Sequence, residues 1–193
     1  ISPNLSINCE CEDVLEYLNI FYDDKLDNKN RDSWFNNINK WKKEFTLKDE
    51  GNILSSNYII SCLSNNLENN ENYLLTTGVG SHQMVAAQYF DHRYPNKLLT
   101  SGSLGTMGVG LPFAIGAQLA EPNSSVILLD GDASFTMSSN EIATIREYNL
   151  PIKIFVLNDG TLKMVDYWQE LFYEGRKMGT KFNYIPKFDK LAE

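Results

Sequence analysis

The chain of 193 residues has few of several residue types, and each shortage excludes a class of function. Its three cysteines are Cys9, Cys11 and Cys62, which are too few for a disulfide framework and typical of reduced thiols inside a cell. Cys9 and Cys11 lack a second cysteine pair or a nearby histidine, so a metal site there is set aside. No apolar run approaches the ~20 residues of a membrane helix. Since no signal segment is visible either, we expect a soluble intracellular protein, in the cytoplasm or in an organelle such as a plastid.

Positive charge is also scarce. The formal net charge is −8, which argues against a nucleic-acid partner or an anionic membrane surface, because few basic groups are available to neutralise phosphates. A small anion held by a bound cation remains compatible with this charge. The chain lacks a Gly-x-x-x-x-Gly-Lys loop, which disfavours a plain nucleotide-binding domain. It begins at Ile1 rather than at methionine, so we expect it to be part of a longer protein.

Residues 1–50 differ in composition from the rest and are predicted to be a tail, or the end of a preceding domain with a linker. Apolar residues recur there at helical spacing: Trp34, Ile38, Trp41 and Phe45. This spacing predicts an amphipathic helix over 32–45, capped by Asp32 or Ser33. Its apolar stripe is expected to pack on a neighbour rather than to stack on nucleic acid.

Residues 51–193 are predicted to form one domain in which apolar strands alternate with helices. The polar run 64–72 is typical of a solvated loop or insertion. The predicted strands span residues 73–77, 97–100, 125–129 and 152–157, and the predicted helices span 82–90, 110–120, 138–148 and 164–173. Continuously apolar strands that alternate with helices indicate an α/β fold, a doubly wound parallel sheet flanked by helices. Right-handed crossovers would place every strand-to-helix loop at one edge of that sheet.

Two of these loops carry a carboxylate shortly after a buried strand, namely Asp132 and Asp159. Successive parallel strands end at one edge, so we expect both side chains to converge on one hard cation such as Mg²⁺. Small residues at Gly131, Ala133 and Ser134 would let a phosphate approach backbone N–H groups at the start of the next helix. Aspartate is also a common turn residue, so either loop alone would carry little weight.

This pair of loops resembles the Gly-Asp-Gly…Asn-Asn signature of thiamine-diphosphate enzymes, here written Gly131-Asp132-Ala133 and Asn158-Asp159. The resemblance implies that Mg²⁺ is held by Asp132, Asp159 and the main-chain oxygen of Thr161, and that it clamps the diphosphate of the cofactor. Two residues depart from the signature. Ala133 replaces a glycine with another small residue, whereas Asp159 replaces an asparagine and adds a negative charge.

A longer set of motifs resembles one family of these enzymes, the acetohydroxyacid (acetolactate) synthases. The matching segments are Thr76 to Met84, Ala86 to Gln88, Leu99 to Gly108, Gly110 to Pro112, Ala114 to Ala117, Met164-Val165, Trp168 and Leu171 to Tyr173. The stretch from Trp34 to Lys43 resembles the end of that family's central domain. The resemblance covers most of the chain from Asp32 to Glu193, and it identifies residues 51–193 with the C-terminal, thiamine-diphosphate-binding domain of the catalytic subunit.

The resemblance also implies roles for individual residues. Met107 would support the bent cofactor and the carbonyl of Gly105 would hold its pyrimidine amino group, so these two are the predicted catalytic residues. Met164 and Trp168 would line the pocket of the second substrate, although their spacing alone is typical of core positions. His82 is explained as readily by packing or capping as by a place near the cofactor. The predicted cofactor contacts are Val79, Gly80, Ser81, His82, Gly105, Met107, Gly131, Asp132, Ala133, Ser134, Asp159, Thr161, Leu162 and Met164.

The implied function is part of an acetolactate synthase active site, which decarboxylates pyruvate and joins it to a second 2-keto acid in branched-chain amino acid biosynthesis. The resemblance implies that the full-length protein is a homodimer or larger, and that it is able to bind FAD and a regulatory subunit. The activating glutamate of the family lies in an N-terminal domain outside these residues, so they are expected not to turn over alone.

Two departures keep other functions open. Ser81 and Lys163 stand where the family usually has Gln and Gly. The alternatives are a sister enzyme, such as pyruvate oxidase or a 2-keto acid decarboxylase, and a non-catalytic thiamine-diphosphate-binding module.

Overall fold

The computed structural model describes residues 2–21, 28–47 and 54–193. The chain divides into two compact units, residues 1–46 and 47–193. The first unit contains helix α1 (Cys11–Phe21) and helix α2 (Asn28–Glu44). The identity of this unit as a tail or as the end of a preceding domain remains a prediction.

Helix α2 contains most of the predicted helix 32–45 but begins before it. It starts at Asn28, so the predicted cap at Asp32 or Ser33 is wrong, since both residues lie inside the helix. The residues near Asn28 are as polar as those near Asp32, so composition alone does not show where the helix begins. Trp34 and Trp41 meet edge to face, with their ring centroids 5.5 Å apart. Within the described residues their stripe is not covered, because the two side chains stay 56% and 44% exposed.

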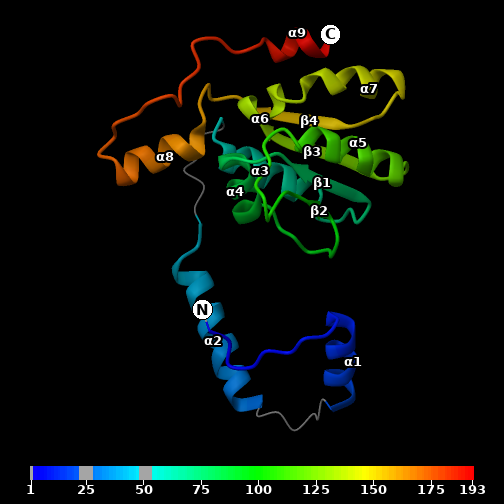
Figure 1. Ribbon diagram of the computed structural model, residues 1–193, viewed down its shortest axis with the longest axis vertical. Coiled ribbons are helices and arrows are strands. Elements are labelled where there is room, and N and C mark those ends of the chain that lie inside the picture. Colours follow the sequence, from blue (N-terminus) through cyan, green and yellow to red (C-terminus); the bar gives the residue numbers. More distant parts are fainter. Residues whose placement is uncertain (1, 22–27, 48–53) are drawn as a thin grey trace. The chain divides into compact units, whose positions relative to one another are not determined.

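The second unit is an α/β domain built on a parallel sheet with the strand order β2-β1-β3-β4 (Figure 1). The strands are β1 (Tyr73–Thr77), β2 (Leu98–Leu99), β3 (Ser125–Gly131) and β4 (Lys153–Leu157). The helices are α3 (Ser56–Asn66), α4 (Ser81–Tyr89), α5 (Gly110–Ala120), α6 (Asp132–Thr136), α7 (Ile142–Glu147), α8 (Lys163–Phe172) and α9 (Phe188–Ala192), with a 3-10 turn η1 at Ser139–Glu141. Among the described helices none is long and apolar enough to cross a membrane. The predicted parallel sheet is confirmed.

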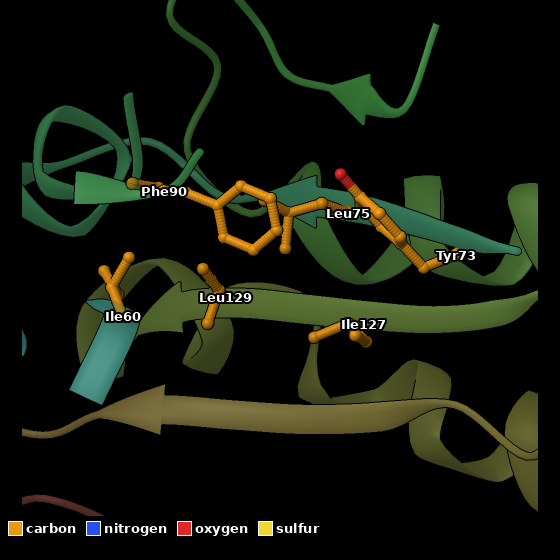
Figure 2. Packing of buried hydrophobic residues seen from close by; sticks show 7 residues of the cluster. Ile60, Tyr73, Leu75, Phe90, Ile127 and Leu129 are labelled. Carbon is orange, nitrogen blue, oxygen red and sulfur yellow. The ribbon is translucent and has the colours of Figure 1, made fainter. Parts of the chain in front are cut away.

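Helices cover both faces of the sheet, which explains why strand β3 is apolar from Val126 to Leu129. One core packs β1 and β3 against α3 and α4, and Figure 2 shows its members Ile60, Tyr73, Leu75, Phe90, Ile127 and Leu129. The other core packs Val126 and Leu128 of β3 against α5 and α6. Successive side chains of β3 point to opposite faces, so both sets are buried. The doubly wound arrangement is therefore confirmed.

The helices differ from the predictions at several places. Helices α1, α3, α6 and α9 were not predicted. Helix α3 extends into the polar run 64–72, so that run is a loop only after Asn66. Ser55 begins α3, because its side chain accepts a hydrogen bond from the Tyr58 N–H at 3.1 Å. The predicted helix 138–148 is divided into the turn η1 and the shorter helix α7.

The strand order determines where a ligand site can form. The chain passes from β1 to β2 on one side and then returns to β3 on the other side of β1, so the connections diverge between β1 and β3. In open α/β sheets ligands bind at such a switch point, beyond the carboxyl ends of the strands. The pairs Thr77↔Leu129 and Gly131↔Leu157 bring the ends of β1, β3 and β4 to one edge.

Replacing Leu128 by alanine tests the core beneath this edge. Leu128 is fully buried (0% exposed) in β3, between β1 and β4. We expect Leu128→Ala to lower the free energy of unfolding by about 2–5 kcal/mol, measured by denaturant titration, because the lost contacts leave a cavity. Leu171 in α8 is 74% exposed, so Leu171→Ala is the matched control and should change this free energy by less than about 0.5 kcal/mol. Equal losses in both variants would contradict the assignment of the core.

Candidate active site

A cavity of about 440 Å³ lies at the carboxyl edge of the sheet, over the ends of β3 and β4. It is lined by all the predicted cofactor contacts except Gly105: Val79, Gly80, Ser81, His82, Met107, Gly131, Asp132, Ala133, Ser134, Asp159, Thr161, Leu162 and Met164. Eight residues outside the predicted cofactor contacts also line the cavity: Leu54, Ser56, Ile59, Val156, Leu157, Asn158, Lys163 and Val165. The first three belong to α3 or precede it, and the serine cap at Ser55 is the signal that could have located this wall.

Asp132 is a buried carboxylate of the cavity wall that accepts two backbone hydrogen bonds. It begins α6 and is only 3% exposed. Its Oδ1 accepts a hydrogen bond from the Ala133 N–H and its Oδ2 accepts one from the Gly160 N–H, each at 2.7 Å. Burial raises the pKa of Asp132 above its usual value, the two N–H donors lower it, and the nearby charge of Asp159 raises it again. The second donor links the loop after β3 directly to the loop after β4.

Asp159 lies in that second loop and shapes its turn. Its Oδ1 accepts hydrogen bonds from the Thr161 N–H at 3.0 Å and from the Thr161 hydroxyl at 2.8 Å. Thr161 also forms an antiparallel bridge with Lys181. On either side of this bridge the Leu162 N–H donates to the Thr180 carbonyl at 2.8 Å, and the Phe182 N–H donates to the Gly160 carbonyl at 3.0 Å. The loop is therefore held by residues 180–182 as well as by Asp132.

The donor set of these two loops fits a hard divalent cation. Among the described residues there is no group of three His, Cys, Asp or Glu side chains that could hold a metal. A cation here would take the carboxylates of Asp132 and Asp159 and complete its shell with main-chain, water and ligand oxygens, which is the pattern that Mg²⁺ prefers. Thr161 lines the same cavity.

Two helix N-termini also meet the cavity, which favours an anionic ligand. Ser81 and His82 of α4 and Lys163 and Met164 of α8 lie in the first turns of these helices and line the cavity. In the described structure neither helix has a side-chain cap, so backbone N–H groups are available to a bound anion. The ammonium of Lys163 lies 5.1 Å from the ring centroid of Tyr167, one turn further along α8.

The two predicted catalytic residues occupy different positions. Met107 lines the cavity, whereas Gly105 is exposed and does not line it. The loop that carries both is fixed by the Gly108 N–H, which donates to the Ser134 hydroxyl at 3.0 Å. Gly108 has φ +80°, and a Cβ there would lie 2.9 Å from the Cβ of Met137, so only glycine fits this turn.

Of the two residues predicted for the second-substrate pocket, only one lines the cavity. Met164 lines the cavity, but Trp168 does not. Trp168 is 59% exposed and meets the ring of Phe172 edge to face at 5.9 Å. Its predicted pocket role therefore rests on the family resemblance and not on a contact within the cavity.

The fold and the cavity define a class of protein that sequence comparison identifies. Residues 78–193 match the family described as thiamine pyrophosphate enzyme, C-terminal TPP binding domain. The match covers more than half of the chain, so the chain belongs to this family.

Within this class the chain is similar to acetolactate synthases, which confirms the predicted resemblance. It is 46% identical over 170 residues to the mitochondrial acetolactate synthase catalytic subunit of Saccharomyces cerevisiae, covering 86% of this chain and 25% of that protein. It is 43% identical over 169 residues to the mitochondrial catalytic subunit of Aspergillus candidus, covering 84% and 24%. It is 37% identical over 183 residues to the chloroplastic acetolactate synthase of Arabidopsis thaliana, covering 93% and 27%. The chain spans about a quarter of the length of these relatives.

The raised pKa of Asp132 predicts how the effect of Mg²⁺ depends on pH. A carboxyl whose pKa is raised by folding stabilises the fold fully below its unfolded pKa, and this contribution is lost as pH rises through the folded pKa. A cation binds only the ionised carboxylate. We therefore expect Mg²⁺ to increase the melting temperature of the chain with thiamine diphosphate at neutral pH, and this gain to shrink as pH falls through the pKa of Asp132.

Thermal melts with Mg²⁺ or with a chelator, between about pH 4 and pH 7, measure this gain. Asp132→Ala is the control and should remove the gain at every pH. A gain in the wild-type chain that does not change with pH would contradict the role of Asp132.

Proposed function

We propose that this chain binds thiamine diphosphate through Mg²⁺ and forms part of an acetolactate synthase active site. The observation that carries the proposal is the hydrogen bond from the Gly160 N–H to Asp132 Oδ2, which ties the two carboxylate-bearing loops together at the cavity edge. The similarity to acetolactate synthase catalytic subunits supports the same assignment.

The residues of the cavity divide into two groups by the part of the cofactor that they would hold. Asp132, Asp159 and the main-chain oxygen of Thr161 would bind Mg²⁺, and the cation would carry the diphosphate. The N–H groups at the starts of α4 and α8 would receive the phosphate oxygens that the cation leaves open. The side chain of Met107 would support the bent form of the cofactor. The carbonyl of Gly105, which lies outside the cavity lining, would accept a hydrogen bond from its amino group, as the resemblance implies.

The proposed reaction consumes pyruvate and a second 2-keto acid and yields CO₂ and a 2-acetohydroxy acid. The cofactor, when bound, supplies the carbon nucleophile for this chemistry, and the protein orients the reactants and excludes water. Met164 contributes an apolar wall to the cavity. Trp168 would complete the pocket of the second 2-keto acid, as the resemblance implies.

The partners and the location belong to the same proposal. We expect a homodimer or larger assembly in the full-length protein, with a regulatory subunit and with FAD bound outside residues 51–193. The compartment is proposed to be the cytoplasm or an organelle, and the mitochondrial and chloroplastic relatives are consistent with an organelle.

A non-catalytic binding module is the second candidate, and one observation favours it. Ser81 and Lys163, which differ from the family's usual Gln and Gly, both line the cavity. A lysine in the first turn of α8 opposes the helix dipole and adds a charge beside the reacting groups.

Calorimetry tests the cofactor site. Thiamine diphosphate should bind the chain in the presence of Mg²⁺, and Asp132→Ala should weaken this binding by about a hundredfold or more, because the cation loses its most buried ligand. Asp189 in α9 is exposed and does not line the cavity, so Asp189→Ala is the matched control and should bind like the wild type. Equal affinity with and without Mg²⁺ would rule out the two-loop metal site.

Product analysis tests the reaction. A full-length protein that contains this chain is supplied with pyruvate, thiamine diphosphate, Mg²⁺ and FAD, and acetolactate is expected as the main product. Acetaldehyde or acetyl phosphate would instead indicate a sister enzyme. The absence of any product, with cofactor binding intact, would indicate the non-catalytic module.

A further inference from the structure

Asp130 is a fully buried carboxylate that lies behind the cavity and does not line it. Its Oδ1 accepts a hydrogen bond from the Gly131 N–H at 2.9 Å and lies 3.2 Å from Nε2 of His82. Among the described residues neither Asp130 Oδ2 nor His82 Nε2 has an aligned hydrogen-bond partner. A buried carboxylate with incomplete pairing destabilises a fold, so packing alone does not explain Asp130.

Glycines make room for this carboxylate and for the imidazole beside it. A Cβ at Gly78 would lie 1.8 Å from Asp130 Oδ1, and a Cβ at Gly110 would lie 2.9 Å from Asp130 Oδ2. A Cβ at Gly131 would lie 2.7 Å from Nδ1 of His82. The surrounding backbone is therefore shaped to hold this carboxylate against this ring.

The ring of His82 lies between Asp130 and the cavity. His82 is only 5% exposed, and it lines the cavity together with Gly80 and Gly131. Its Nε2 is the ring nitrogen beside Asp130, whereas its Nδ1 is the one near these two glycines; a Cβ at Gly80 would lie 3.0 Å from Nδ1. The edge of the ring that carries Nδ1 thus belongs to the part of the wall where small residues admit a phosphate.

We propose that Asp130 is a positioning residue that acts through His82 and holds the imidazole with Nδ1 toward the diphosphate. The inference rests on the proposed function, because it takes the anion to be the diphosphate of the cofactor. The two ring nitrogens of His82 face different neighbours, because Nε2 lies beside Asp130 and Nδ1 lies near Gly80 and Gly131. A carboxylate behind a functional histidine commonly fixes its orientation, and contacts that are misaligned in a free site tighten when the ligand binds.

Two variants of similar size isolate the positioning role. Asp130→Asn keeps an oxygen acceptor beside Nε2 of His82, whereas Asp130→Leu removes it. The first readout is the set of His82 ring resonances in the cofactor-free chain, which should move in Asp130→Leu and stay close to wild type in Asp130→Asn. The second is the Kd for thiamine diphosphate with Mg²⁺, which should rise about tenfold in Asp130→Leu and less in Asp130→Asn.

A double-variant cycle with His82→Gln separates positioning from a purely structural role. If Asp130 acts through His82, Asp130→Leu adds no further rise in Kd to the His82→Gln variant. An equal rise in Kd on adding Asp130→Leu to the wild type and to the His82→Gln variant would overturn the proposal. Unchanged His82 resonances in Asp130→Leu would also overturn it. If Asp130→Leu does not fold, Asp130→Ala replaces it in the same measurements. Absence of binding by the wild type would instead refute the proposed function, while the cofactor-free resonances would still decide whether Asp130 orients His82.

Discussion

The site depends on one hydrogen bond, from the Gly160 N–H to Asp132 Oδ2 at 2.7 Å. It joins the loop after β3 to the loop after β4, and these two strands are themselves paired in parallel. Without this bond the loop that carries Asp159 would be held only from its outer side, where Thr161 pairs with Lys181. This part of the cavity wall thus consists of two loops that are joined by a hydrogen bond and that follow two paired strands.

The ionised form of Asp132, which a bound cation would require, is disfavoured by the fold. Its burial raises its pKa, which means that the ionised form is held in the fold at a cost. The N–H donors of Ala133 and Gly160 offset part of this cost, and a bound cation would offset the remainder. Groups with perturbed pKa values gather at functional sites for this reason. An ionised Asp132 without a bound cation is therefore expected to lower the stability of the domain.

The sequence is sufficient to predict the strands and the cavity edge, because β3 and β4 are apolar runs and parallel strands end together. The same reasoning placed Asp132 and Asp159 in one wall. Helix α3 was missed because polar residues interrupt its apolar period and its burial is decided by the sheet it covers. The contact between His82 and Asp130 could not be predicted, because it depends on the register of β3 against β1 rather than on sequence spacing.

The two apolar faces of β3 have a consequence for folding. In most strands a polar face and an apolar face determine the register, since a slip of one residue exchanges them. A slip of β3 would replace one set of buried apolar side chains with another and change the buried area little. It would, however, move Asp130 away from the space that Gly78 and Gly110 provide. The polar end of the strand therefore distinguishes the native register of β3 from a shifted one, which its apolar residues alone do not.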